Sequence, residues 1–366
     1  MSFYMTERFW KVVGLGAALA FATPDGPVWG EENVVSEKSK VIFSGRLHAQ
    51  FHTSNVKAVP SNSSFFVRRA RLTAEYENMP GTLAAEVQYD LGEGDSDLKS
   101  GFVDLRLSPR FNIKLGQYKK PFSLWEQTSS RKIAVIERAN SIIGSEGKSS
   151  NHLLEDDGLY AGRDIGAMLH GEADKVEYYL GVFNGNGSNT EGDDDDGKLV
   201  VARIVINSLK DLAFGASVAR RAVSEYADPV RQVTASANFE AFEFDFEYGI
   251  RHDVSRTGVW IQTEFAYGSN PYFSDSAKFL GFAFIGSYNM RLSEGRKAYS
   301  VRPAFRFDYA KGNTDDDDTG NILFTSGLDI FLDKHNKVQM NLDINLPQKT
   351  GADPEMALRV QFQMHI

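Results

Sequence analysis

Hydrophobic and polar residues alternate strictly over the end of the chain, from Met356 to Ile366. Successive side chains of a β-strand point to opposite faces, so this segment predicts a strand with one apolar and one polar face. Two environments suit such a strand. In a soluble sandwich the apolar face packs on a core, whereas in an outer-membrane barrel it faces lipid and the polar face lines a wet lumen. The apolar face would carry Leu358, Val360, Phe362, Met364 and Ile366.

The same two-faced pattern recurs along the chain, and helical spacing fits none of these segments. Clear examples are found at 41–52, 83–91, 242–251, 299–309 and 338–346. Strand counting predicts sixteen strands if 234–251 forms one long strand. A break at 239–241 would give seventeen and would put the two termini on opposite sides. We expect sixteen, because an even number is the rule for single-chain bacterial barrels.

The connections between the predicted strands alternate in length. Short turns are expected at 78–81, 108–110, 171–174, 207–210 and 333–336. Longer polar loops are expected at 53–65, 91–98, 119–161, 184–198, 221–230, 269–277, 311–320 and 347–355. Short turns on one side and long loops on the other are typical of an up-and-down barrel in an outer membrane, so we predict an all-β transmembrane antiparallel barrel.

Composition agrees with this fold class and excludes others. The chain has 366 residues, 42% of them hydrophobic, and outside the N-terminus it contains no run of about 20 apolar residues that would form a membrane helix. It has no cysteine, which excludes disulfides and thiolate metal sites, and we expect neither a metal site nor a cofactor. A net charge of -9 gives no support to nucleic-acid binding.

The N-terminus predicts export. Arg8 and Lys11 precede an apolar stretch, 12–22, of the length typical of a signal-peptide core. We predict a signal peptide over 1–30, a periplasmic segment over 31–40 and a barrel over 41–366 in the outer membrane of a Gram-negative cell. The alternative for the first residues is a short membrane anchor or an amphipathic helix.

The connection at 119–161 is the one long insertion, and long loops in compact folds are usually functional or disordered. It combines an apolar stretch, 133–136, with six basic residues, namely Lys119, Lys120, Arg131, Lys132, Arg138 and Lys148. We predict that this third loop folds into the lumen and narrows it. The alternative is a loop that covers the outside of the barrel or makes subunit contacts.

Several blocks of sequence, in a fixed order, resemble one family. They are Phe66-Val67-Arg68-Arg69-Ala70-Arg71-Leu72, 114–126, 128–131, Glu137-Arg138, Arg163-Asp164-Ile165-Gly166, 182–185, 201–203 and Arg359. Together they resemble the phosphate-selective porin O and P family. The resemblance implies a homotrimeric sixteen-stranded channel whose third extracellular loop folds inward and whose arginines, with a loop lysine, hold an anion at the constriction. Arg68 and Arg69 match the constriction arginines of that family, and Lys132 lies near the place of the loop lysine. Ile366 stands where such barrels typically end in an aromatic residue.

Alternation also predicts which charges face the lumen. Strict alternation turns Arg68 outward, so its family role requires a local bulge, since a charge at the lipid midplane costs roughly 2–4 kcal/mol. The predicted pore-wall bases are Arg46, Arg106, Arg302, Arg306 and Arg359, beside Arg69 and Arg71. Barrel closure puts the last strand beside the first, so we expect Arg359 beside Arg46 in one basic wall, with acids of later strands across the lumen. The alternative is that these charges pair with one another.

The sequence therefore predicts a porin for the passive diffusion of small hydrophilic solutes. Small anions such as phosphate would be favoured at a constriction of Arg68, Arg69, Arg71, Lys132 and the long loop, because arginine matches oxyanions well. Other expected partners are outer-membrane lipid and lipopolysaccharide.

Two other functions are alternatives without a selective transport role. One is a barrel enzyme, although no G-x-S-x-G motif is present and the seven histidines are scattered. The other is a surface or adhesion barrel whose acidic tracts, Asp193–Asp196 and Asp315–Asp318, gather divalent cations.

Overall fold

The structure is a computed structural model. It describes residues 33–36, 39–57, 62–94, 96–190, 197–223, 237–293, 295 and 298–366. The predicted signal peptide and the acidic tract at 193–196 lie outside these residues.

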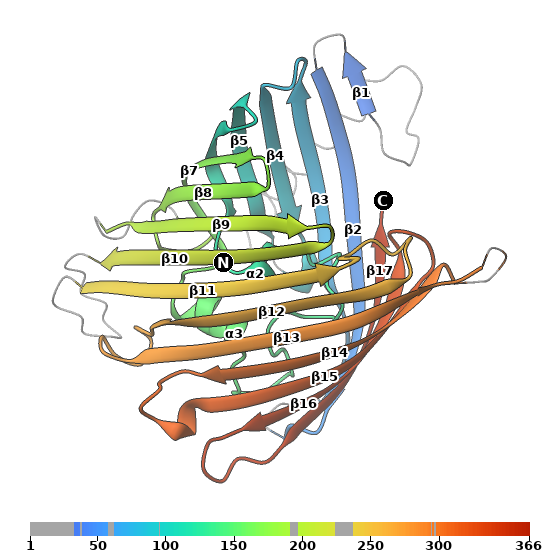
Figure 1. Cartoon of the computed structure of the whole chain (residues 1–366). Helices are drawn as coiled ribbons and strands as arrows, with labels where there is room; N and C mark the ends of the chain where they lie inside the picture. Colours follow the sequence, from blue (N-terminus) through green and yellow to red (C-terminus); the bar gives the residue numbers. More distant parts are fainter. Residues whose placement is uncertain are drawn as a thin grey trace, which may run out of the picture.

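Sixteen strands form a closed antiparallel barrel, because each strand pairs with its chain neighbours and the last strand pairs with β2 (Figure 1). Their bounds are β2 (Ser39–Ser54), β3 (Ser63–Asn78), β4 (Leu83–Asp90), β5 (Asp97–Ser108), β6 (Phe111–Lys119), β7 (Arg163–Ala173), β8 (Val176–Phe183), β9 (Leu199–Leu209), β10 (Leu212–Val223), β11 (Ala237–Gly249), β12 (Gly258–Ser269), β13 (Lys278–Arg291), β14 (Ser300–Lys311), β15 (Gly320–Phe331), β16 (Lys337–Pro347) and β17 (Glu355–His365). β11 is one continuous strand, so the predicted strand number is confirmed.

The two faces of β17 resolve the choice that its sequence left open. Leu358, Phe362 and Ile366 are 40–47% exposed on the outside of the barrel, whereas Arg359 and Gln361 are fully buried inside it. An apolar outer face on a closed barrel is the arrangement that lipid requires. The outer face therefore faces the membrane, as predicted.

Barrel closure fixes the level of each residue, and here one expectation was wrong. Arg359 pairs with His52, whereas Arg46 pairs with His365 at the end of β17. Arg359 and Arg46 therefore lie at different heights in the barrel and not side by side. The cause is that β17 ends opposite the middle of β2, where the backbone of Ile366 exchanges hydrogen bonds of 2.7 and 2.9 Å with Gly45.

The start of β2 runs beyond the end of β17, and a short additional strand, β1 (Asn33–Ser36), pairs with it. This pairing covers part of a strand edge that β17 leaves without a partner, and an open edge is a site for unwanted pairing. The barrel sheet thus begins at Ser39, two residues before the predicted boundary.

Among the described residues, helical structure is confined to short pieces of the connections. In the long connection between β6 and β7 they are α2 (Leu124–Gln127), α3 (Ser150–His152) and η2 (Leu153–Asp157). Two others are η1 (Gly92–Gly94) and η3 (Asp317–Thr319). Across the described residues, no helix is long and apolar enough to cross a membrane.

Val360 lies at the middle of β17 on its outer face, so Val360→Lys should lower the free energy of unfolding by about 2–4 kcal/mol. The reason is that a charge would enter hydrocarbon at the midplane. Urea unfolding in lipid vesicles, followed by tryptophan fluorescence, measures this. Leu332→Lys is the matched control, since Leu332 lies in an exposed turn, and should cost only about 0–1 kcal/mol. Equal losses in the two variants would contradict a lipid-facing β17.

Candidate functional site

The connection between β6 and β7, residues 120–162, makes hydrogen bonds to strands across the barrel (green in Figure 1). Ser123 Oγ and the Trp125 amide donate to Glu264 of β12 at 2.8 and 3.0 Å. The amide and hydroxyl of Ser150 donate to Asp308 of β14 at 2.8 and 2.7 Å. These carboxylates are buried on the inward-facing side of their strands, so the connection is tied to the inner wall at two separated points.

Apolar packing holds the same connection. Phe122, Leu153 and Tyr160 form one buried cluster with inward-facing residues of β8 and β9. Ile133 and Val135 form a second cluster with Trp260 and Ile285. A fully buried side chain of this size contributes roughly 1.5–3 kcal/mol, so these contacts form a core inside the barrel. The prediction that 133–136 has something to pack against is confirmed.

Three of the predicted pore-wall arginines are buried beneath this connection, which corrects their assignment. Arg302 pairs with Asp329 at 2.5 Å, Arg306 with Asp308 at 2.9 Å and Arg359 with Asp343 at 2.6 Å. None of the three is more than 1% exposed. Backbone carbonyls of the connection complete two sites, because Arg302 donates to the Ile133 oxygen and Arg306 to the Glu137 oxygen. A buried guanidinium needs such partners, so these residues brace the wall instead of lining open space.

Arg106 also departs from the predicted wall. It is about half exposed near the turn end of β5 and pairs with Glu77 at 2.7 Å. The alternative of mutual charge pairing thus holds for Arg106 as well. It holds across the lumen too, where Arg203 lies 2.9 Å from Glu243 and 2.6 Å from Asp245.

Arg68 and Arg69 converge on one carboxylate because β3 carries a bulge. His48 pairs with Arg69 and Ala49 with Val67, which leaves Arg68 as the extra residue. Arg68 Nε lies 2.7 Å and Arg69 Nη2 3.0 Å from the carboxylate of Glu137. The bulge required to turn Arg68 from the lipid is therefore present.

We call the contact of Arg68 and Arg69 with the Glu137 carboxylate the clamp, and neighbouring residues pack closely around it. Gly92 packs on the bulge, and a Cβ added there would come within 2.8 Å of the Arg68 carbonyl oxygen. Burial alone would raise the pKa of Glu137, but Arg69 and Arg68 outweigh it and hold the pKa well below the usual range. Glu137 therefore stays ionised and joins the long connection to β3.

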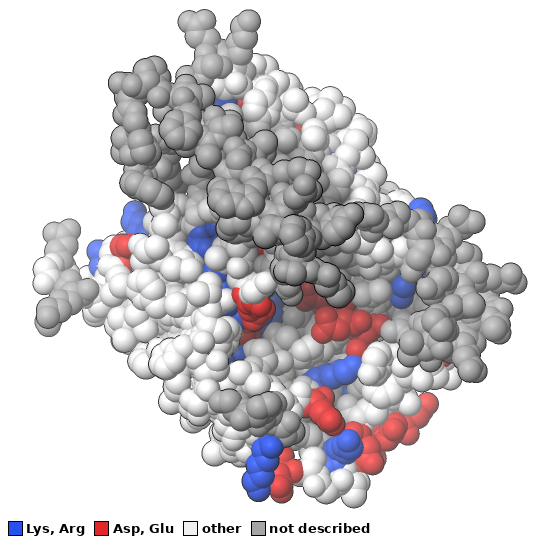
Figure 2. Space-filling view, turned by 180° about the vertical axis from the view of Figure 1, so that it is seen from behind, with Lys and Arg blue, Asp and Glu red and all other residues white. Residues whose placement is uncertain are grey.

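Two of the cavities that remain in the interior lie beside the long connection. One of about 590 Å³ lies toward the turns, and a second of about 340 Å³ lies toward the loops. Three residues line both cavities, namely Arg71, Arg138 and Arg163. We call these three the arginine neck. Figure 2 shows acidic and basic side chains gathered in a hollow on one face of the molecule.

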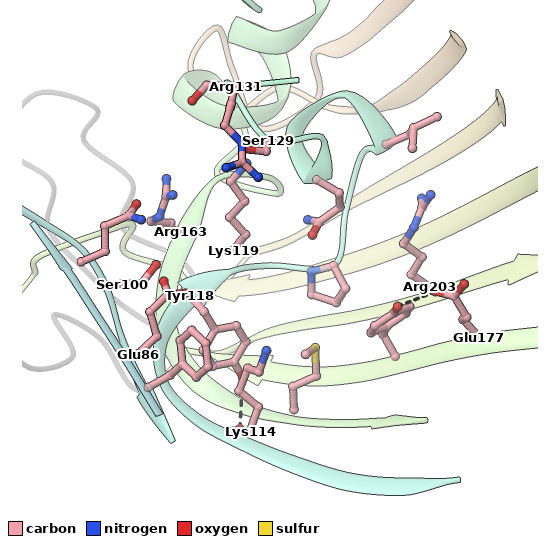
Figure 3. A pocket seen from close by; sticks show the side chains of 18 of the residues that line it. Glu86, Ser100, Lys114, Tyr118, Lys119, Ser129, Arg131, Arg163, Glu177 and Arg203 are labelled. Atoms are coloured by element: carbon pink, nitrogen blue, oxygen red, sulfur yellow. Dashed lines mark hydrogen bonds between the residues drawn. The ribbon is translucent and has the colours of Figure 1, made fainter. Parts of the chain in front are cut away.

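The neck arginines differ in how far their charge is neutralised. Arg71 lies 2.6 Å from Asp90, and Arg138 lies 3.6 Å from Glu126. Arg163 has no carboxylate within 4.0 Å among the described residues, although it borders both cavities. Lys119 and Arg131 lie near it in the larger cavity (Figure 3). Arg163 thus places a positive charge that has no ion-pair partner among the described residues at the junction of the two cavities.

One carboxylate at the neck responds to pH near neutrality. Glu155 lines the smaller cavity in η2. The negative charge of Glu126, then burial, then the charge of Asp156 raise the pKa of Glu155 to about 7. The smaller cavity therefore gains negative charge as the pH rises through neutrality.

The predicted site residues fall into separate groups. Arg69 and Arg71 face inward as expected, and Arg68 does so through the bulge. Lys132 is not with them, because its Nζ lies 2.9 Å from Nε2 of His252, in a turn, and it lines neither cavity. The sequence placed Arg138 and Arg163 in its family blocks but gave no signal that they meet.

Comparison with known proteins supports the fold and defines the family. A family model described as phosphate-selective porin O and P matches residues 41–276. Similar solved structures include an anion-selective porin from Comamonas acidovorans, at 12% identity and TM-score 0.62, covering 90% of this chain and 100% of that one. OmpF of Salmonella typhi in complex with daunomycin has 12% identity and TM-score 0.63, with coverage of 91% and 100%. The trimer form of OmpT from Vibrio cholerae has 12% identity and TM-score 0.58, with coverage of 90% and 100%. No curated protein sequence matches the chain.

Because the pKa of Glu155 is about 7, the preference for anions should fall as the pH rises from about 6 to about 8. Glu155 is neutral at the lower pH and adds a negative charge beside the neck at the higher pH. Reversal potentials in a KCl gradient across planar bilayers measure this slope.

Glu155→Gln should clearly reduce the slope, whereas Glu93→Gln, which removes another carboxylate from the same cavity, should keep it at the wild-type value. A slope of wild-type size in Glu155→Gln would show that another group is responsible.

Proposed function

The chain belongs to the phosphate-selective porin O and P family, and from this membership we propose that it lets small anions diffuse passively through the arginine neck. It is a porin of the Gram-negative outer membrane. We propose in addition an anion preference, a constriction and a trimeric assembly.

The observation that carries the proposal is that the same three arginines line both cavities. A solute that passes from one cavity to the other meets Arg71, Arg138 and Arg163 on its way. Guanidinium groups present a fixed fork of donors that suits phosphate or carboxylate oxygens. Fixed charge at a narrow point is an established source of selectivity in pores.

The role proposed for the long connection is to narrow the channel at this point. Its hydrogen bonds to Glu264 and Asp308, together with its buried apolar residues, support this role. Arg68 and Arg69 line the smaller cavity, but their shared contact with Glu137 favours a structural duty. In this proposal they hold the constriction in place and add to its positive field.

The preference for anions should be mild. Glu126 and Glu155 line the same cavity as the neck and reduce its net positive charge. Burial raises the pKa of Glu126, but Lys119, Arg138 and Arg163 outweigh burial and lower it to about 2, so Glu126 stays charged at neutral pH. Phosphate is one solute of suitable size and charge. The porin from Comamonas acidovorans, which shares the fold, is anion-selective, and this is compatible with the proposal.

We also propose that the protein assembles as a homotrimer. The family resemblance implies this state, and a trimer form is known for OmpT of Vibrio cholerae, which shares the fold. The apolar outer face of the barrel would contact lipid and lipopolysaccharide outside the subunit contacts. The mass of the detergent-solubilised protein, determined by light scattering, tests the assembly.

The double variant Arg71→Gln with Arg163→Gln should lower the chloride-to-potassium permeability ratio by roughly three- to tenfold. The reason is that two of the three neck charges disappear while polar, hydrogen-bonding side chains remain. Reversal potentials in a KCl gradient measure the ratio. Arg256→Gln serves as the control, because Arg256 is exposed, pairs with Asp211 and lines neither cavity. A cation-selective wild type that the double variant leaves unchanged would refute the anion proposal.

A further inference from the structure

One sector of the inner wall departs from the polar lining that porin lumens usually have. At inward-facing positions β5 carries Phe102, β6 carries Tyr118, β7 carries Met168 and β8 carries Tyr179. All four side chains line the larger cavity. We call these four residues the apolar strip.

The apolar strip continues from the core that holds the long connection. Tyr118 and Met168 belong to the buried cluster around Phe122 and Tyr160. Phe102 and Tyr179 are not part of that cluster but pack against it. Phe102 and Tyr179 are only partly buried, so their rings reach open space in the cavity. The rings of Phe102 and Tyr118 meet edge to face, with centroids 6.0 Å apart.

Basic groups border the strip. Lys114 Nζ lies 4.3 Å from the ring centroid of Phe102 and 5.6 Å from that of Tyr118. Toward the neck, Lys119 directly follows Tyr118 in the chain and lines the same cavity. Figure 3 shows Lys119, Arg131 and Arg163 at one end of the cavity and Tyr118 with Lys114 at the other. A single cavity thus presents a cationic end and an aromatic wall.

We propose that the larger cavity is a transient binding site, within the permeation path, for small organic anions that carry an aromatic ring. The carboxylate or phosphate group would meet Arg163 and Arg131, neither of which forms an ion pair among the described residues, and the ring would pack on Phe102 and Tyr179. The inference rests on the proposed anion passage and names the solute class that it favours. A volume of about 590 Å³ is within the usual range of small-molecule sites.

Neither the basic end nor the apolar strip alone would select anions that carry an aromatic ring. The basic end attracts any small oxyanion, whereas the strip adds a contact only for a solute with an apolar face. Two aromatic rings packed offset or edge to face stabilise a complex by more than the apolar area they bury, and Phe102 presents such a ring beside Tyr118. The site should therefore separate benzoate from acetate, which carry the same charge and differ in the ring.

The test is block of the chloride current through the full-length protein in planar bilayers by benzoate and by acetate. The wild type should show half-block at a benzoate concentration roughly tenfold below that of acetate. Phenyl phosphate and inorganic phosphate form a second pair, which asks whether the head group matters. A ring effect in both pairs supports the proposal, and equal block within both pairs overturns it.

Phe102→Leu keeps an apolar side chain of similar volume and should therefore fold, but it should reduce the benzoate-to-acetate difference to about threefold or less. Ser100→Ala is the control, because Ser100 lines the same cavity from the neighbouring inward position of β5. It should leave the difference unchanged. An unchanged difference in Phe102→Leu would overturn the assignment of the strip.

Failure of the proposed function would look different. A cation-selective wild type in a KCl gradient would refute the anion preference, and the absence of any block by benzoate would then overturn the aromatic site as well. A cation-selective channel that benzoate still blocks more strongly than acetate would refute the anion preference alone. Anion selectivity with equal block would overturn only the aromatic site.

Discussion

A charged side chain on the inner face of the barrel needs either water or an oppositely charged partner. This constraint divides the interior into a covered wall and a sector that contains the cavities. Along β14 to β17 the long connection covers the inner wall, and Arg302, Arg306 and Arg359 there are paired with aspartates of the same wall. Arg302, Arg306 and Arg359 are at most 1% exposed, and loop carbonyls complete the sites of Arg302 and Arg306. A buried ion pair that loses one partner leaves an uncompensated charge, so the connection and this wall depend on each other. The two cavities lie mainly along β2 to β11, and we propose that selectivity arises there.

The bulge in β3 links the covered wall to the sector that contains the cavities. It turns Arg68 inward beside Arg69, and both bind Glu137, which lies between the buried stretch 133–136 and Arg138 of the neck. The clamp therefore helps to position a neck residue one place along the chain. In this way the bulge in β3 links the wall to the arginine neck, which we propose as the narrowest part of the open path. Of the three constriction arginines that the sequence predicts, Arg68 and Arg69 bind Glu137, whereas Arg71 itself borders both cavities.

The barrel could be predicted from the sequence because alternation is a local property. The outward face of β17 follows from period two within a single segment, whereas the continuous β11 follows from the even strand number of single-chain bacterial barrels. The height of Arg359 relative to Arg46 could not be predicted in this way, since it depends on where β17 ends against β2. Likewise, alternation shows that Arg302 and Arg306 face inward, but only the path of the long connection decides that they are covered. Lys132 lies beside His252 for the same reason, because the direction of a loop side chain has no periodic signal.

The central claim is that the connection packs on one wall and leaves a path past the neck. Thiol accessibility tests it most directly, since the chain has no cysteine of its own. Ala134 is fully buried against the wall, whereas Ala139 lines the smaller cavity. With a charged methanethiosulfonate reagent added to open channels, Ala139→Cys should react quickly and change the current, and Ala134→Cys should stay unmodified. Rapid modification of Ala134→Cys at the rate of Ala139→Cys would contradict the account.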